Sequence, residues 1–166
     1  TPDQAFERFF EWTSDRGIEL WDHQEEALMD LAAGDHVILG TPTGSGKSLV
    51  ALGMLFMGMA QGKRCYYTAP IKALVSEKFF ALCEAFGAER VGMLTGDAAV
   101  NPTAPIICCT AEVLANLALR QGHRLTLGQL LQKGSHLLQN GAIGAAAAER
   151  LGGNGAVKRP LAKGVL

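Results

Sequence analysis

A glycine-rich stretch that ends in a lysine and a serine has the residue types needed to bind a polyphosphate. It reads Thr41-Pro42-Thr43-Gly44-Ser45-Gly46-Lys47-Ser48. Binding a polyphosphate takes several backbone N–H groups aimed at one point, and glycine allows the tight turn and the close approach. Lys47 would reach the β- and γ-phosphates, and the Ser48 hydroxyl would hold Mg²⁺. We therefore predict a nucleoside-triphosphate site in which Lys47 and Ser48 are the catalytic residues.

The flanking sequence favours a phosphate-binding loop. Residues 36–39 form a short apolar run typical of a buried parallel strand, and residues 47–61 have helical character. A loop between a strand and a helix brings the positive end of the helix dipole to the phosphates. One position departs from the strict motif, because Thr41 stands where the first glycine belongs. The alternative is a glycine-rich turn that only caps a helix. Phosphate binding alone does not distinguish a kinase, a GTPase, a recombinase and a helicase.

The elements that must position this loop are predicted from apolar spacing and from glycines that end helices. Helices are expected at residues 1–15, 22–33, 47–61, 71–86 and 111–120, and strands at 36–39, 64–68, 90–94 and 105–109. Strands that alternate with helices predict an α/β fold with a mostly parallel sheet. In the first helix the apolar side is expected to consist of Phe6, Phe9, Phe10 and Trp12. The second helix is expected to be capped by Asp22.

The composition limits the classes of protein that remain. Of the 166 residues, 48% are apolar and 19% are charged, which suits one folded domain. The formal net charge of −1 excludes a globally basic nucleic-acid binder, so any nucleic-acid surface must be local. The longest apolar or glycine run, residues 49–60, is shorter than the ~20 residues needed to cross a bilayer, so no membrane partner is expected. The four cysteines lack metal-ligand spacing, which favours free thiols in the cytoplasm.

Charge and composition change near residue 121. Residues 1–120 contain 9 basic and 15 acidic residues, whereas residues 121–166 contain 6 basic residues and one acidic residue. Nine of the 20 glycines lie in the second segment, which has weak periodicity and no strong strand pattern. We expect residues 1–120 to form the nucleotide-binding domain, and residues 121–166 to form a divergent basic tail that is either poorly ordered or contains a short helix with an apolar face. That face would consist of Leu127, Leu130, Leu131, Leu137 and Leu138.

Five blocks in order make the sequence similar to a known family. They are Trp21-Asp22-His23-Gln24, the phosphate-binding loop, Thr68-Ala69-Pro70-Ile71-Lys72-Ala73-Leu74, Gly92-Met93-Leu94-Thr95-Gly96-Asp97 with Asn101-Pro102, and Thr110-Ala111-Glu112-Val113-Leu114. Across about residues 17–120 the chain resembles the first RecA-like domain of superfamily-two DExH/DEAD-box helicases, above all the superkiller-like RNA helicases. The resemblance implies a P-loop NTPase fold, ATP and Mg²⁺ as cofactors, and Gln24 as the residue that reads the adenine edge through its amide.

The later blocks carry the nucleic-acid site that the resemblance implies. The expected partner is RNA or single-stranded DNA, bound through its sugar–phosphate backbone. Pro70 and Lys72 lie where a strand meets a helix, a place suited to phosphate contact. The resemblance implies that Thr95, Gly96 and Thr110 also contact the backbone of this nucleic acid.

The acidic box that the family uses to hydrolyse ATP is not found in the sequence. That box, D-E-x-H or D-E-x-D, should lie on a strand soon after residue 120. The last aspartate is Asp97, and only Glu112 and Glu149 are acidic after it. We therefore expect a domain that is incomplete at its C-terminal side, a second helicase domain that is absent from this chain, and no hydrolysis by the chain alone. The alternatives are a non-catalytic nucleotide- or nucleic-acid-binding module and another P-loop enzyme such as a kinase.

Overall fold

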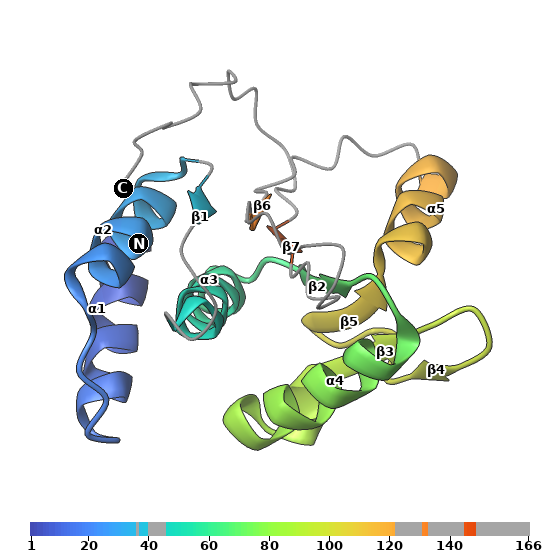
Figure 1. Cartoon of the computed structure of the whole chain (residues 1–166), viewed down its shortest axis with the longest axis horizontal. Coiled ribbons are helices and arrows are strands. Elements are labelled where there is room, and N and C mark those ends of the chain that lie inside the picture. Colours follow the sequence, from blue (N-terminus) through green and yellow to red (C-terminus); the bar gives the residue numbers. More distant parts are fainter. Residues whose placement is uncertain (36, 40–45, 122–130, 133–144, 149–166) are drawn as a thin grey trace.

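Helices and strands alternate along the chain, as the apolar spacing predicts. The computed structural model describes residues 1–35, 37–39, 46–121, 131–132 and 145–148 (Figure 1). The helices are α1 (Pro2–Ser14), α2 (Asp22–Ala33), α3 (Lys47–Ala60), α4 (Lys72–Phe86) and α5 (Ala111–Gln121), with a 3-10 turn at Ala88–Arg90. The strands are β1 (Ile38–Leu39), β2 (Cys65–Ala69), β3 (Val91–Leu94), β4 (Ala99–Val100), β5 (Ile106–Thr110), β6 (Leu131–Gln132) and β7 (Ala145–Ala148).

The main sheet has the strand order β4-β3-β5-β2-β7. Its three inner strands, β3, β5 and β2, are parallel, while β4 and β7 run antiparallel to their neighbours at the two sides. Strand β1 pairs in parallel with β6 in a separate two-stranded sheet. The prediction of an α/β fold with a mostly parallel sheet flanked by helices is therefore confirmed.

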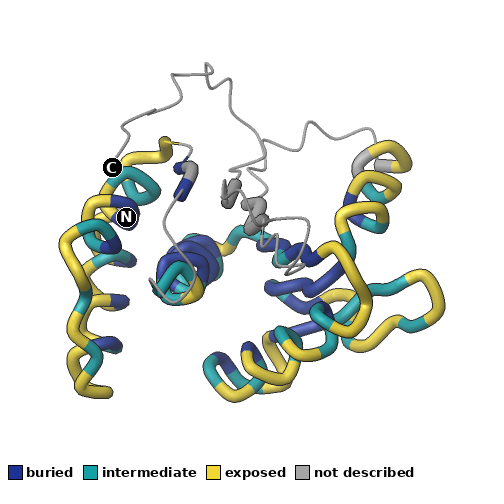
Figure 2. Tube along the Cα trace, viewed as in Figure 1, coloured by how far each residue is buried: buried dark blue, intermediate teal, exposed yellow. Residues whose placement is uncertain are grey.

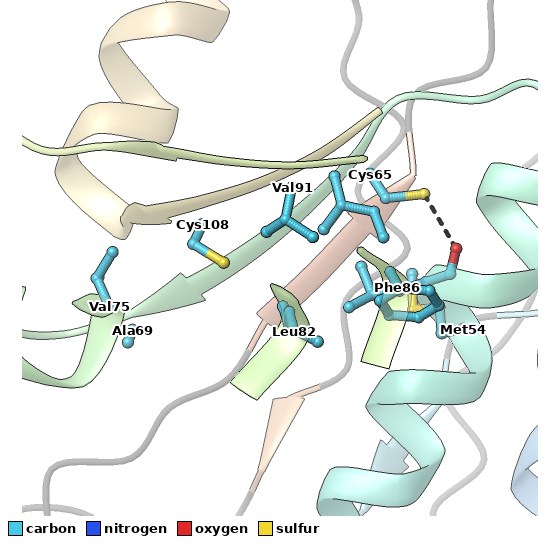
Figure 3. Packing of buried hydrophobic residues seen from close by; sticks show 10 residues of the cluster. Met54, Cys65, Ala69, Val75, Leu82, Phe86, Val91 and Cys108 are labelled. Carbon is cyan, nitrogen blue, oxygen red and sulfur yellow. Dashed lines mark hydrogen bonds between the residues drawn. The ribbon is translucent and has the colours of Figure 1, made fainter. Parts of the chain in front are cut away.

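The inner strands β2 and β5 are buried on both faces of the sheet, because helices cover each face. In Figure 2 the inner strands are coloured mostly as buried, and they lie between α4 and α5. On one face, side chains of β2 and β5 pack with α3 and α4, and Figure 3 shows Cys65 and Cys108 among them. On the other face, Tyr66, Ile107 and Cys109 pack with Leu114 of α5. Side chains that alternate between two apolar layers make these strands apolar throughout, as is typical of parallel sheets.

A second apolar cluster joins α1 and α2 to α3. Phe9, Leu28 and Val50 are fully buried in it, and the ring centroids of Phe9 and Phe56 lie 5.5 Å apart. The expected apolar side of α1 was wrong at Phe10, which is 44% exposed. Successive helix residues are rotated by about 100°, so with Phe9 at the centre of the buried face of α1, Phe10 lies at its margin. The cluster fixes the two N-terminal helices against the helix that begins with Lys47.

Three short strands have no counterpart among the predicted elements. Strand β4 pairs with β3 to form a hairpin, and two segments beyond residue 121, β6 and β7, pair with β1 and β2. The run of four alanines in β7 lacks the β-branched and aromatic residues that mark a strand in a sequence. The rest of the predicted tail lies outside the described residues. Within the described part of the chain, each helix is too short or too polar to span a bilayer.

Candidate nucleotide and nucleic-acid site

The predicted phosphate-binding loop leads into α3. Gly46 is the N-cap of α3 and has a left-handed backbone with φ 73° and ψ 22°, which favours glycine. Its carbonyl accepts a hydrogen bond of 3.0 Å from the Leu49 N–H. Lys47 and Ser48 are the first two residues of the helix. The remaining predicted loop residues, Thr41, Pro42, Thr43, Gly44 and Ser45, lie outside the described residues.

Lys47 and Ser48 have surroundings that fit a phosphate and a magnesium ion. Partial burial lowers the pKa of the Lys47 ammonium, so a nearby anion would offset the cost of its desolvation. The exposed Ser48 side chain offers a hydroxyl oxygen, a hard ligand of the kind that Mg²⁺ prefers. N–H groups in the first turn of a helix have no partner within the helix and can bond an anion there. In the described part of the chain, His, Cys, Asp and Glu form no metal-binding group of three.

Gln24 lies beside this loop in space, although it is 22 residues from Gly46 in sequence. Its amide nitrogen donates to the Gly46 carbonyl at 3.0 Å, and its amide oxygen accepts from the Trp21 N–H at 2.9 Å. The side chain is buried, with 4% exposure. The expectation that Asp22 caps α2 was wrong by one residue. Trp21 is the N-cap, because Gln24, three residues on, bonds its backbone N–H.

The predicted nucleic-acid residues gather at one edge of the sheet. Strands β2, β3 and β5 are parallel, so their carboxyl ends lie at the same edge. Ala69, which precedes Pro70, pairs with Thr110, and Thr95 follows the last residue of β3. The structure therefore brings together blocks of the chain that are far apart in sequence.

Lys72 and the β3–β4 turn form an ion-paired group at this edge. The Lys72 ammonium contacts the Asp97 carboxylate, and the Thr95 hydroxyl donates to the same carboxylate at 3.0 Å. The hydrogen bonds from Lys72 and Thr95, together with the charge of Lys72, lower the pKa of Asp97. Gly96 is exposed at the turn. Asp97 was not among the predicted site residues, since no local pattern in the sequence shows which cation it meets.

Thr110 ends β5 and helps to begin α5. Its hydroxyl accepts from the Val113 N–H at 3.4 Å, a long hydrogen bond with the spacing of a helix cap. A helix that starts at this edge points its positive dipole end toward the same side as α4 does. The edge thus combines two helix starts with the exposed ammonium of Lys72.

The fold is that of a RecA-like α/β domain. It has parallel strands with helices on both faces of the sheet, and the polar sequence blocks lie at the carboxyl edge of these strands. The chain belongs to the DEAD/DEAH box helicase family, whose sequence model matches residues 21–132. This match confirms the family expected from the five sequence blocks.

Known relatives are helicases, and this chain covers a small part of each. It is 38% identical over 106 residues to the probable helicase HelY of Mycobacterium tuberculosis, a match of 64% of this chain and 12% of HelY. It is 36% identical over 103 residues to the antiviral helicase SKI2 of Saccharomyces cerevisiae, covering 62% of this chain and 8% of SKI2. The expected likeness to the superkiller group is confirmed.

A solved structure supports the same fold. The crystal structure of the DUF1998 helicase MrfA bound to DNA and AMPPNP matches 70% of this chain and 18% of MrfA, with a TM-score of 0.59 and 26% sequence identity. The chain therefore spans only about a tenth to a fifth of the length of these proteins. The roles of individual site residues stay predictions.

Proposed function

We propose that this chain is the ATP-binding part of an ATP-dependent RNA helicase. The observation that carries the proposal is the start of α3, where a left-handed glycine is followed by Lys47 and Ser48 within a helicase domain. The names of relatives support RNA as the substrate, since they include two DExH-box RNA helicases of Arabidopsis thaliana. The MrfA structure, which is bound to DNA and AMPPNP, supports a nucleotide and a nucleic acid as the ligands.

The proposed nucleotide site consists of residues 41–48 and Gln24. Lys47 neutralises charge on the β- and γ-phosphates, and Ser48 holds Mg²⁺ through its hydroxyl. Backbone N–H groups of the loop and of the first turn of α3 bond the phosphate oxygens. When bound, Mg²⁺ would offset the negative charge of the phosphate chain.

Calorimetric titration with Mg·ATP tests the nucleotide site. Lys47→Ala should abolish measurable binding, because it removes the point charge on the phosphates. The matched control is Lys78→Ala, which removes a lysine that pairs with Glu77 on the surface of α4. Equal binding by the wild-type chain and Lys47→Ala would overturn the proposed site.

The proposed nucleic-acid site is the carboxyl edge of β2, β3 and β5. A single strand lies across this edge and contacts Pro70, Lys72, Thr95, Gly96 and Thr110 through its phosphates and sugars, independently of base sequence. Lys72→Ala should weaken the binding of single-stranded RNA equally for different sequences, as measured by fluorescence anisotropy. A loss that depends on the RNA sequence would contradict backbone recognition.

We further propose that these 166 residues bind ATP without turnover. The sequence contains no aspartate after Asp97, so no D-E-x-H or D-E-x-D box follows α5. A second helicase domain would supply the arginine finger, which is worth about 10³- to 10⁵-fold in rate. Phosphate release that depends on both RNA and Lys47 would refute this part of the proposal. The free thiols of the described cysteines suit a reducing compartment, and we propose a cytoplasmic location.

A further inference from the structure

The hairpin of β3 and β4 carries part of the proposed nucleic-acid site at its turn, yet its second strand buries little surface. Strand β4 has only two residues, Ala99 and Val100, and both of them are exposed. They pair with Leu94 and Met93, the last two residues of β3. Because a short hairpin is marginally stable by itself, other contacts must fix its position on the domain.

Asn101 supplies such contacts at the base of the hairpin. It follows β4 directly, and its side-chain amide nitrogen donates to the carbonyls of Glu89 at 3.1 Å and Val91 at 3.4 Å. Val91 is the first residue of β3, and Glu89 lies in the 3-10 turn before it. The carbonyl of Asn101 also accepts the Ala104 N–H at 3.1 Å. One residue therefore joins the end of β4 to the start of β3 and to the segment that leads into β5.

The backbone of Asn101 suits an asparagine. Its φ is 43°, and in the described part of the chain it is the only residue other than glycine with a positive φ. Asparagine adopts this left-handed conformation more readily than most residues that have a side chain. The carbonyl of Asn101 also lies so close to Gly92 of β3 that a Cβ on that glycine would collide with it. Side-chain bonds and close backbone packing therefore both fix Asn101 against β3.

The opposite end of the hairpin meets α4. The Thr95 N–H bonds the Ala98 carbonyl at 2.9 Å and closes the turn, and Asp97 contacts Lys72 at the start of α4. Asn101 lies at the base, away from this turn. Any effect of Asn101 on a nucleic acid bound at the turn is therefore transmitted through the hairpin.

We infer that Asn101 is a positioning residue, which holds the β3–β4 hairpin so that its turn presents Thr95 and Gly96 to the backbone of a single strand. The inference rests on the proposed nucleic-acid site. Without the amide the turn samples more positions, and a strand that binds has to order it first, which lowers affinity. The proposed nucleotide site does not include the hairpin, so its affinity is independent of Asn101.

Asn101→Gly tests this role, because glycine keeps the left-handed backbone and removes the amide. We expect the affinity for single-stranded RNA, measured by fluorescence anisotropy, to fall by about threefold to tenfold, the loss typical of one hydrogen bond. The calorimetric affinity for Mg·ATP should stay the same. Thr103→Gly is the matched control. Thr103 is exposed in the same connection, and among the described residues its carbonyl, not its side chain, accepts a hydrogen bond, so neither affinity should change.

Two results of these titrations would overturn the inference. Unchanged RNA affinity in Asn101→Gly would mean that the turn is positioned without the amide. An equal fall in the affinities for RNA and for Mg·ATP would mean that Asn101 supports the whole domain rather than the hairpin.

Hydrogen exchange tests the same role without any ligand. The Thr95 N–H reports on the turn, and the Cys65 N–H, which bonds the Pro105 carbonyl at 2.7 Å, reports on the sheet. We expect exchange at Thr95 to rise at least about threefold in Asn101→Gly and to be unchanged in Thr103→Gly, while Cys65 exchanges as in the wild type. Unaltered exchange at Thr95, or an equal rise at Cys65, would refute the inference.

If Asn101→Gly does not fold, the exchange measurement is made on Asn101→Asp, with the same expected and refuting results. Aspartate has a similar size and tolerates a positive φ, but its carboxylate cannot donate to the two carbonyls. If the wild-type chain binds no single-stranded RNA or no Mg·ATP, that part of the proposed function fails, and hydrogen exchange alone decides the inference.

Discussion

Lys72, the first residue of α4, forms an ion pair with Asp97, which lies 25 residues later in the turn between β3 and β4. Both side chains are more than half exposed, and the Thr95 hydroxyl bonds the same carboxylate. The ammonium proposed to meet a phosphate is thus already beside an anion. A nucleic-acid phosphate that binds Lys72 must compete with Asp97 or share the cation with it.

Asp97→Asn should therefore strengthen the binding of single-stranded RNA. The substitution removes a competing negative charge and keeps a side chain of the same shape. Because exposed ion pairs are weak, we expect a gain of about twofold to fivefold at low salt, measured by fluorescence anisotropy. The gain should shrink as salt screens the charges.

Asp15→Asn is the control for a general change in net charge. Asp15 follows α1, which lies at the opposite end of the molecule from the β3–β4 turn in Figure 1. It should raise RNA affinity by less than Asp97→Asn does. Equal gains in the two variants, or weaker binding by Asp97→Asn, would contradict a local competition at Lys72.

Two glycines of the β3–β4 hairpin should respond differently to alanine. A Cβ on Gly92 would collide with the backbone carbonyl of Asn101 and lie 2.8 Å from a methyl group of Ile107, whereas a Cβ on Gly96 meets nothing within 4 Å. Backbone atoms cannot move aside as a flexible side chain can. Gly92→Ala should lower the free energy of unfolding by about 1 to 3 kcal/mol, and Gly96→Ala should change it little, in urea titrations. Equal stability of the two variants would contradict the packing of β4 against β3.

The stability of the fold should decline at alkaline pH. Burial raises the pKa of the Cys65, Cys108 and Cys109 thiols to about 12 from a model-peptide value of 9.0. Above pH 9 the unfolded chain loses these protons while the folded chain keeps them, so the free energy of unfolding falls with rising pH until about pH 12. Each thiol contributes at most about 1.4 kcal/mol per pH unit in this window.

Urea titrations between pH 8 and pH 11 measure this decline. Cys109→Ala removes one of the three thiols, so its stability should fall less steeply with pH than that of the wild type. The comparison is between slopes, because the lost packing contacts of the sulfur atom lower stability at every pH. If the free energy of unfolding falls equally steeply with pH in the two proteins, Cys109 does not contribute to the decline as expected.

Gly53 allows the side chains of α1 and α2 to approach α3 closely. It lies within a helix at ordinary φ, where alanine is normally favoured by about 1 kcal/mol. Here an added Cβ would lie 2.7 Å from the Phe9 ring and would also collide with Leu28. Gly53→Ala should therefore destabilise the fold in urea titrations, by about 1 to 3 kcal/mol. In the Phe9→Leu background the cost should be smaller, and an unchanged cost would mean that the two residues do not interact.

Local signals in the sequence account for most of the elements. Helices α2 and α3 are followed by Gly34 and Gly62, and α4 by Gly87, and all three glycines have positive φ in the structure. Such positions are readable from a single sequence, because glycine is the residue that adopts this conformation without cost. The Pro2 start of α1 with its Thr1 cap is readable for the same reason.

Contacts between distant segments could not be predicted in this way. The bond from Gln24 to Gly46 and the pair of Lys72 with Asp97 join residues 22 and 25 positions apart. Spacing within one helix or strand does not determine which elements meet in space. The residues of the site could therefore be predicted from the sequence, whereas the hydrogen bond and the ion pair between distant residues became visible only in the folded structure.

The four residues from Ile106 to Cys109 in β5 are all buried, so water lies on neither side of this strand. Polar and apolar side chains do not alternate in this stretch, so a slip of the strand register by one residue is not penalised by moving apolar side chains into water. Alignment must come from the ends: the Pro105 carbonyl accepts the Cys65 N–H at 2.7 Å, and Thr110 caps the next helix. The helix that begins after Thr110 therefore sets where β5 ends, at the position where Thr110 pairs with the last residue of β2.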